Sequence, residues 1–185
     1  MSSTMADLGV LLLRIAVAFI LFAHATQKLL GWFRGPGLDK ITVVFEALGQ
    51  VPARPLAKLA AWCELSAALL LVLGIATPLG AAIGAGTMLV AGFAMTAKSG
   101  AVWNALGGGE YPLVLTVLAL SLAFTGPGSI SLDAGLGVPW YGAGGRAVVI
   151  GLVAVAVAIL AAAPPIFRTV WMRRAVAADE LAAGA

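Results

Sequence analysis

Apolar residues dominate five segments of the chain, and polar or turn-forming residues separate them. The segments are Leu8–Trp32, Leu56–Ile75, Leu79–Ala97, Tyr111–Phe124 and Ala147–Phe167. A helix needs about 20 apolar residues to cross the hydrocarbon core of a bilayer. The pattern therefore predicts five transmembrane helices, of which the fourth, with roughly 14 residues, is the shortest.

Two of the connections carry helix signals of their own. Pro78 lacks an amide proton and suits the first turn of a helix, so Thr77–Gly80 predicts a tight turn that makes the second and third spans antiparallel neighbours. Within Leu38–Gly49, apolar residues recur at helical spacing among charged ones, which predicts a short amphipathic interfacial helix. The glycine-rich stretches Gly107–Gly109 and Gly126–Gly145 predict loops.

Composition agrees with an all-α membrane protein. The 185 residues are 62% hydrophobic and 10% charged, with a mean hydropathy of +1.05, and the net charge of +3 is too small to indicate nucleic-acid binding. We expect a four-helix bundle over 1–135, a loop and an additional transmembrane helix over 136–167, and a basic, then alanine-rich cytoplasmic tail over 168–185. The first span lacks a basic residue before Arg14, so we expect it to stay in the mature chain rather than act as a signal peptide.

Basic residues orient this predicted bundle. Nine of them fall on the side of the C-terminus: Lys28, Arg34, Lys40, Arg54, Lys58, Lys98, Arg168, Arg173 and Arg174. Arg146 is the only basic loop residue on the other side. Because cytoplasmic loops carry an excess of Lys and Arg, we expect a cytoplasmic C-terminus and an external N-terminus. If the last apolar segment were absent or re-entrant, both termini would share one side.

Ionisable residues inside the spans are the first candidates for function. Arg14, His24 and Lys28 lie in the first span and Glu64 in the second, where a bare charge costs at least about 2.5–3.5 kcal/mol. Counted from the same side, His24 and Glu64 lie at the same depth, so we expect them to face one another and handle protons. Depth and helical spacing extend the predicted cluster to Arg14, His24, Gln27, Lys28, Glu64, Lys98 and Glu110.

A structural interpretation stands beside the functional one. Opposite charges in a bundle can simply hold helices together, and Lys28 and Lys98 can extend to the headgroups, which we favour for these two residues. The single His and the lone Cys63 disfavour bis-histidine haem ligation and a self-contained thiol redox pair. We expect no metal, haem or flavin site, since no Cys/His constellation or phosphate-binding loop is present.

Several ordered stretches resemble the DoxX family of small bacterial membrane proteins. They are Leu12–Arg14 followed by His24, Gln27–Leu29 and Gly31; Glu64-Leu65 with Leu69–Gly74 and Thr77; Gly108–Leu113; and Gly126–Gly128 with Ser131–Asp133. Together they cover roughly residues 8–135. The resemblance implies a four-helix membrane bundle, with quinone-linked oxidation of sulfur compounds in some members and membrane-bound oxidoreductase assemblies in others. It carries over the polar positions Arg14, His24, Lys28, Glu64, Glu110, Ser131 and Asp133.

Our first functional hypothesis is therefore a redox-associated subunit of the bacterial inner membrane that binds a quinone. In it, His24 and Glu64 handle protons, Arg14, Gln27, Lys28 and Glu110 bind the ligand, and redox partner subunits supply electrons. The alternative is a non-catalytic subunit that anchors or stabilises a larger membrane complex. A small transporter is less favoured, because no internal repeat is visible.

The loop over Gly126–Gly145 supplies one further prediction. We expect it to be ordered by Gly126, Gly128, Ser131 and Asp133, with the Asp133 carboxylate accepting hydrogen bonds from nearby backbone amides. Trp140 and Tyr141 are suited to the membrane interface. A lid or partner surface and a plain anchoring connection are equally compatible with this pattern.

Overall fold

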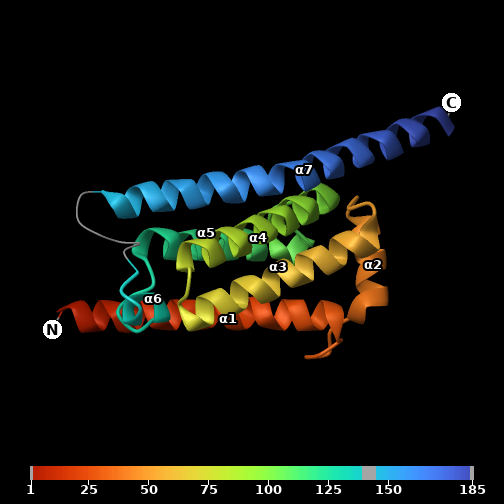
Figure 1. Ribbon diagram of the computed structural model, residues 1–185. Coiled ribbons are helices and arrows are strands. Elements are labelled where there is room, and N and C mark those ends of the chain that lie inside the picture. Colours follow the sequence, from red (N-terminus) through yellow and green to blue (C-terminus); the bar gives the residue numbers. More distant parts are fainter. Residues whose placement is uncertain (1, 139–144, 184–185) are drawn as a thin grey trace.

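The computed structural model describes residues 2–138 and 145–183, and these residues are helical with short connections (Figure 1). The elements in chain order are α1 (Ser2–Leu29), α2 (Gly37–Ala47), α3 (Ala53–Leu73), α4 (Thr77–Ser99), the 3₁₀ turn η1 (Asn104–Leu106), α5 (Glu110–Thr125), α6 (Leu132–Gly135) and α7 (Arg146–Ala183). The expected all-α membrane fold is confirmed.

Four helices are long and apolar enough to cross a membrane unaided: α1, α3, α4 and α7. The fifth apolar helix, α5, has 16 residues and so a length of about 24 Å, short of a full hydrocarbon core. It nevertheless returns the chain along α4 from one end of the bundle to the other (Figure 1). The N- and C-termini consequently lie at opposite ends.

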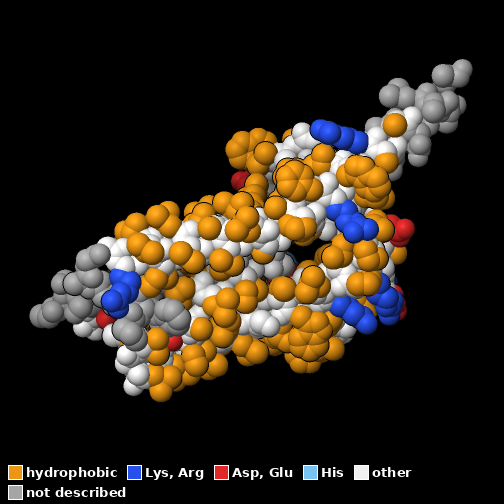
Figure 2. Space-filling view, turned by 45° about the horizontal axis from the view of Figure 1, so that its top comes forward, with side chains coloured by type: hydrophobic (Ala, Val, Ile, Leu, Met, Phe, Trp, Pro, Cys, Tyr) orange, Lys and Arg blue, Asp and Glu red, His pale blue; other side chains and the backbone are white. Residues whose placement is uncertain are grey.

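The two ends of the bundle hold different elements. The α6 end holds the N-terminus, the connection between α3 and α4, and α6 (Figure 1). The α2 end holds α2, η1 and the C-terminal part of α7. Most lysines and arginines on the face seen in Figure 2 gather at the α2 end.

Small residues bring the helices together. The helix α4 packs against α3, α5 and α7, and it buries eight glycines and alanines between residues 80 and 94. A methyl group added at Gly86 would lie 3.2 Å from the carbonyl oxygen of Ala158 on α7. Ala154, Ala158 and Ala162 form the buried stripe of α7 at intervals of four residues. Helices in a membrane typically pack through such small residues, because lipid tails are as apolar as the helix surfaces and the hydrophobic effect does not drive the helices together.

The predicted local elements are largely found. The amphipathic helix is α2, and Pro78 lies in the first turn of α4, which is antiparallel to α3. Two details differ from the sequence analysis. One turn of helix, α6, lies in the stretch predicted as loop, and α7 continues past Phe167 through the predicted tail to Ala183. Trp140 and Tyr141 lie outside the described residues.

Candidate functional site

Arg14 lies fully buried at the α6 end, where its guanidinium binds backbone carbonyls only. Its Nε donates to Leu71 O at 2.9 Å and one terminal nitrogen donates to Val72 O at 3.2 Å, near the C-terminus of α3. The other terminal nitrogen donates to the carbonyls of Pro127 and Ile130 at 2.6 and 2.8 Å. The last carbonyls of a helix have no partner within the helix, so Arg14 satisfies them while fixing the loop.

Asp133 completes this arrangement from the loop side. Its carboxylate accepts hydrogen bonds from the amides of Ala76 and Thr77, at 2.9 and 3.1 Å, and its own amide donates to Gly74 O. It thereby caps the N-terminus of α4, where a negative charge is favourable. Ser131 caps α6 through Ala134, and its hydroxyl donates to Gly128 O.

The predicted ordering of this loop by Asp133 thus has a direct structural basis, with one difference. The amides it binds belong to the start of α4, 56 and 57 residues away in sequence, and not to its own turn. Gly126 and Gly128 both adopt positive φ, +82° and +73°, which favours glycine. We call Arg14, Ser131, Asp133 and the backbone groups they bind the α6-end clasp.

A cavity of about 530 Å³ lies at the other end of the molecule. Its walls come from α1, α2, α3, α4, α5 and α7, and apolar residues predominate in them. The polar side chains in its wall include His24, Gln27, Lys28, Gln50, Thr87, Asn104 and Tyr111, with Cys63 beside them. Figure 2 shows a hollow in the surface near the α2 end, below the part of the molecule that carries the C-terminus.

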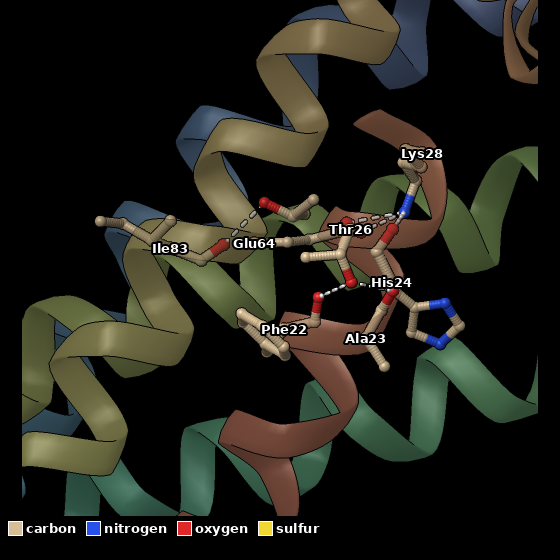
Figure 3. A network of polar contacts seen from close by, with 8 residues as sticks. Phe22, Ala23, His24, Thr26, Lys28, Glu64 and Ile83 are labelled. Atoms are coloured by element: carbon tan, nitrogen blue, oxygen red, sulfur yellow. Dashed lines mark hydrogen bonds and ion pairs between the residues drawn. The ribbon is translucent and has the colours of Figure 1, made fainter. Parts of the chain in front are cut away.

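Lys28 and Glu64 form an ion pair in the wall of this cavity, in which Glu64 is buried and Lys28 is partly exposed. The Lys28 ammonium lies 2.7 and 2.6 Å from the two carboxylate oxygens of Glu64, and 3.4 Å from the carbonyl oxygen of His24 (Figure 3). Lys28 lines the cavity, whereas Glu64 is 1% exposed and lies behind it. The three protons of the ammonium are therefore directed to three protein oxygens.

Equal depth predicts that Glu64 faces His24, but in the structure Glu64 is paired with Lys28. The carboxylate faces Lys28, while the imidazole turns away from the pair and packs edge-on against the ring of Tyr111, with 5.9 Å between centroids (Figure 3). Equal depth fixes only the level of two residues and not their direction. Because helical side chains lean toward the helix N-terminus, Lys28 reaches back to the level of His24.

The predicted cluster of seven residues is thus divided. His24, Gln27 and Lys28 line the cavity, and Glu64 holds Lys28 from behind. Arg14 belongs to the α6-end clasp. Glu110 accepts a hydrogen bond from the amide of Asn104 in the η1 turn and does not line the cavity, and Lys98 is exposed outside it. Lys28 does not extend to the headgroups, because the carboxylate holds it inside the bundle.

Sequence reasoning missed Gln50, which ties the connection before α3 to α7. Its side-chain nitrogen donates to the hydroxyl of Thr169 and to Pro165 O, and both Gln50 and Thr169 are buried. Two consecutive prolines, Pro164 and Pro165, remove two amide donors from α7 here. The missing amides would have bound the carbonyls of Leu160 and Ala161, so the prolines do not predict the bonds of Gln50, and nothing else in the sequence names it.

Residues 9–97 match the family model described as DoxX. The chain carries a DoxX domain. No curated protein and no solved structure matches the chain. The DoxX domain supplies α1 to α4, and with them His24, Gln27, Lys28 and Glu64. The matched region is shorter than the resemblance over 8–135, so Glu110, Ser131 and Asp133 lie beyond it.

The cavity is consequently a joint product of the DoxX domain and the helices that follow it. Tyr111 on α5 and Val157, Ala161 and Pro165 on α7 complete its wall. Within the described residues, no three His, Cys, Asp or Glu side chains gather so as to hold a metal ion. The wall instead offers neutral hydrogen-bonding groups next to a large apolar surface, a combination typical of sites for small organic ligands.

Proposed function

We propose that this integral membrane protein binds a small lipid-soluble molecule in the cavity at the α2 end, and that a quinone fits the site best. The observation that carries the proposal is the cavity itself: about 530 Å³, mainly apolar, with His24, Gln27 and Lys28 on one side. Cavities of this size and character bind organic ligands the size of a quinone ring with part of its tail.

The polar groups of the wall suit the two carbonyl oxygens of a quinone ring. The Gln27 amide, the His24 imidazole and the Tyr111 hydroxyl can each donate a hydrogen bond, and the T-shaped pair of His24 and Tyr111 borders the space for a ring. When bound, a quinone would supply an acceptor for electrons and protons. His24 would exchange a proton at its ring nitrogen, and Glu64 would act at a distance by holding Lys28.

We further propose that redox subunits, membrane-bound or peripheral, provide the electrons, since the chain's own residues suggest no electron carrier. We expect the protein in the bacterial inner membrane with its C-terminus in the cytoplasm, because basic side chains gather at the α2 end (Figure 2). Reporter fusions at Ser2 and Ala185 test the orientation. Both reporters in one compartment would contradict it.

A second candidate function is a non-catalytic subunit that stabilises a larger membrane complex. It is favoured because the charged side chains inside the bundle already have partners within the protein. These side chains are Arg14, Lys28, Glu64 and Asp133. Purification in a mild detergent separates the two. Stoichiometric quinone supports the first function, whereas tightly retained subunits and an empty cavity support the second.

The binding test compares two alanines replaced by the same large residue. Ala60 lines the cavity, whereas Ala156 is exposed on α7 and does not. In titration calorimetry with a short-tailed quinone, Ala60→Phe should weaken binding at least about tenfold, or 1.4 kcal/mol, and Ala156→Phe should leave it unchanged. His24→Leu should weaken it several-fold. Equal binding by the two phenylalanine variants would refute the proposed site.

A further inference from the structure

The cavity has a mouth between α3 and α7. Leu59 on α3 and Val157 on α7 line the cavity and are also 58% and 45% exposed, so they mark its rim. Leu59 follows the first residue of α3 by six positions, and Val157 follows the first residue of α7 by eleven. At 1.5 Å per residue, these rim residues lie roughly 9 and 17 Å from the starts of their helices, within segments long enough to cross the hydrocarbon core.

Helix α4 and a connection near the α2 end border this mouth. In the described residues, α7 packs extensively against α4 and α5 but not against α3, so α4 forms the floor between them. Ala82, Gly86 and Met88 of α4 are buried in this floor and line the cavity. Toward the α2 end, the hydrogen bonds of Gln50 with Pro165 and Thr169 join α7 to the segment before α3.

The ion pair restricts the charge of the ligand's headgroup. The Lys28 ammonium already directs its protons to both Glu64 oxygens and to His24 O. An anionic headgroup would have to compete with the Glu64 carboxylate for this cation, inside a low-dielectric site. The polar groups left to recognise a headgroup by hydrogen bonds are the side chains of Gln27, Asn104 and Tyr111 and the His24 imidazole.

We infer that the opening between α3 and α7 is a lateral portal. Through it, a molecule with a neutral polar headgroup and a flexible apolar tail enters from the bilayer. The headgroup binds beside Gln27 and His24, and the tail lies over Ala82 and Gly86 and leaves between Leu59 and Val157. The identity of the ligand rests on the proposed function, but the route does not, because it follows from the position of the mouth.

Met88 provides a test of the route that needs no headgroup. It is 4% exposed yet lines the cavity, so an apolar diazirine hydrocarbon dissolved in vesicles must enter the cavity to reach it. After photolysis, mass spectrometry should find a carbene adduct on Met88 in the full chain. Val157→Trp should reduce this labelling to background. Val153→Trp, at a somewhat more exposed site on the same helix that does not line the cavity, should not.

A second pair of variants guards against a local effect on α7. Leu59→Trp should also abolish labelling of Met88, while Leu69→Trp on the exposed face of α3 should preserve it. Absence of label on Met88 in the unchanged protein, or equal labelling in all variants, would overturn the portal. Labelled Met88 together with no quinone binding would refute the proposed function and leave the portal standing.

The headgroup inference is tested in vesicles with two tailed ligands that differ in charge. A tailed quinone should protect Met88 from the carbene, and a fatty acid with a tail of equal length should not. Protection by the fatty acid and not by the quinone would contradict the inference that the headgroup of the ligand is neutral.

Discussion

The two ends of the bundle bury similar chemistry and use it differently. At the α6 end, Arg14 and Asp133 have backbone partners arranged around them, four carbonyls for the guanidinium and two amides for the carboxylate. At the α2 end, Lys28 and Glu64 are equally well paired, but their neighbours His24 and Gln27 border a cavity. The first arrangement holds the chain together, whereas the second leaves polar groups directed toward a space.

This difference qualifies the usual interpretation of charges inside membranes. An ionisable residue in a span is by default a candidate for function. Here the most deeply buried cation, Arg14, has its donors directed to main-chain oxygens and borders no cavity described in the structure. A buried charge thus marks a site only where a space and further polar groups lie beside it.

The largest effect should come from breaking the α6-end clasp at Arg14. Arg14→Met leaves four buried carbonyls without a charged donor, so we expect the free energy of unfolding to fall by roughly 4 kcal/mol. Arg14→Lys should rescue little, because an ammonium lacks the planar fork that reaches both loop and helix. Denaturation in mixed micelles measures this loss.

Arg54→Met is the matched control for that experiment. Arg54 is half exposed and pairs with the exposed Asp39, so its loss should cost less than about 1 kcal/mol. Similar losses at Arg14 and Arg54 would mean that the clasp does not stabilise the fold.

The ion pair at the α2 end should show strong coupling. Lys28→Met or Glu64→Gln alone disrupts the pair, and Lys28→Met leaves a buried carboxylate without its cation, so we expect a loss of about 3 kcal/mol for that variant. The double variant should recover much of it, because both charges are then gone. Additive losses in the double-mutant cycle would show that the two residues act independently.

Asp133→Ala should have the smallest effect of the three. It removes a cap from α4, which typically costs about 1–2 kcal/mol. Hydrogen exchange should show the amides of Ala76 and Thr77 losing protection, while Asp39→Ala, at an exposed carboxylate, should change neither. Unchanged protection at both amides would show that Asp133 does not contribute to the α6-end clasp.

The sequence predicted the fold well because lipid imposes simple rules on length and polarity. The apolar segments, α2 and the start of α4 at Pro78 follow from local patterns. The helical tail was missed because residues 168–183 are polar enough to leave the membrane, yet they are rich in alanine and arginine, which favour helix.

The site was predicted only in part, for a geometric reason. Depth along the helices places His24, Lys28 and Glu64 at one level. It does not predict how each helix is rotated about its axis, and this rotation pairs Glu64 with Lys28. The partners of Arg14 and Gln50 are main-chain atoms or residues more than 50 positions away, for which a single sequence contains no signal. The cavity itself depends on α7, which comes last in the chain.

The most direct test of a ligand site at the α2 end is a set of intermolecular nuclear Overhauser effects between a tailed quinone and the protein in nanodiscs. We predict contacts from the ring protons to His24 and Tyr111, and from the tail to Val157 and Ala161. Contacts that map instead to the outer lipid-facing residues, or to the α6 end around Arg14, would contradict the account.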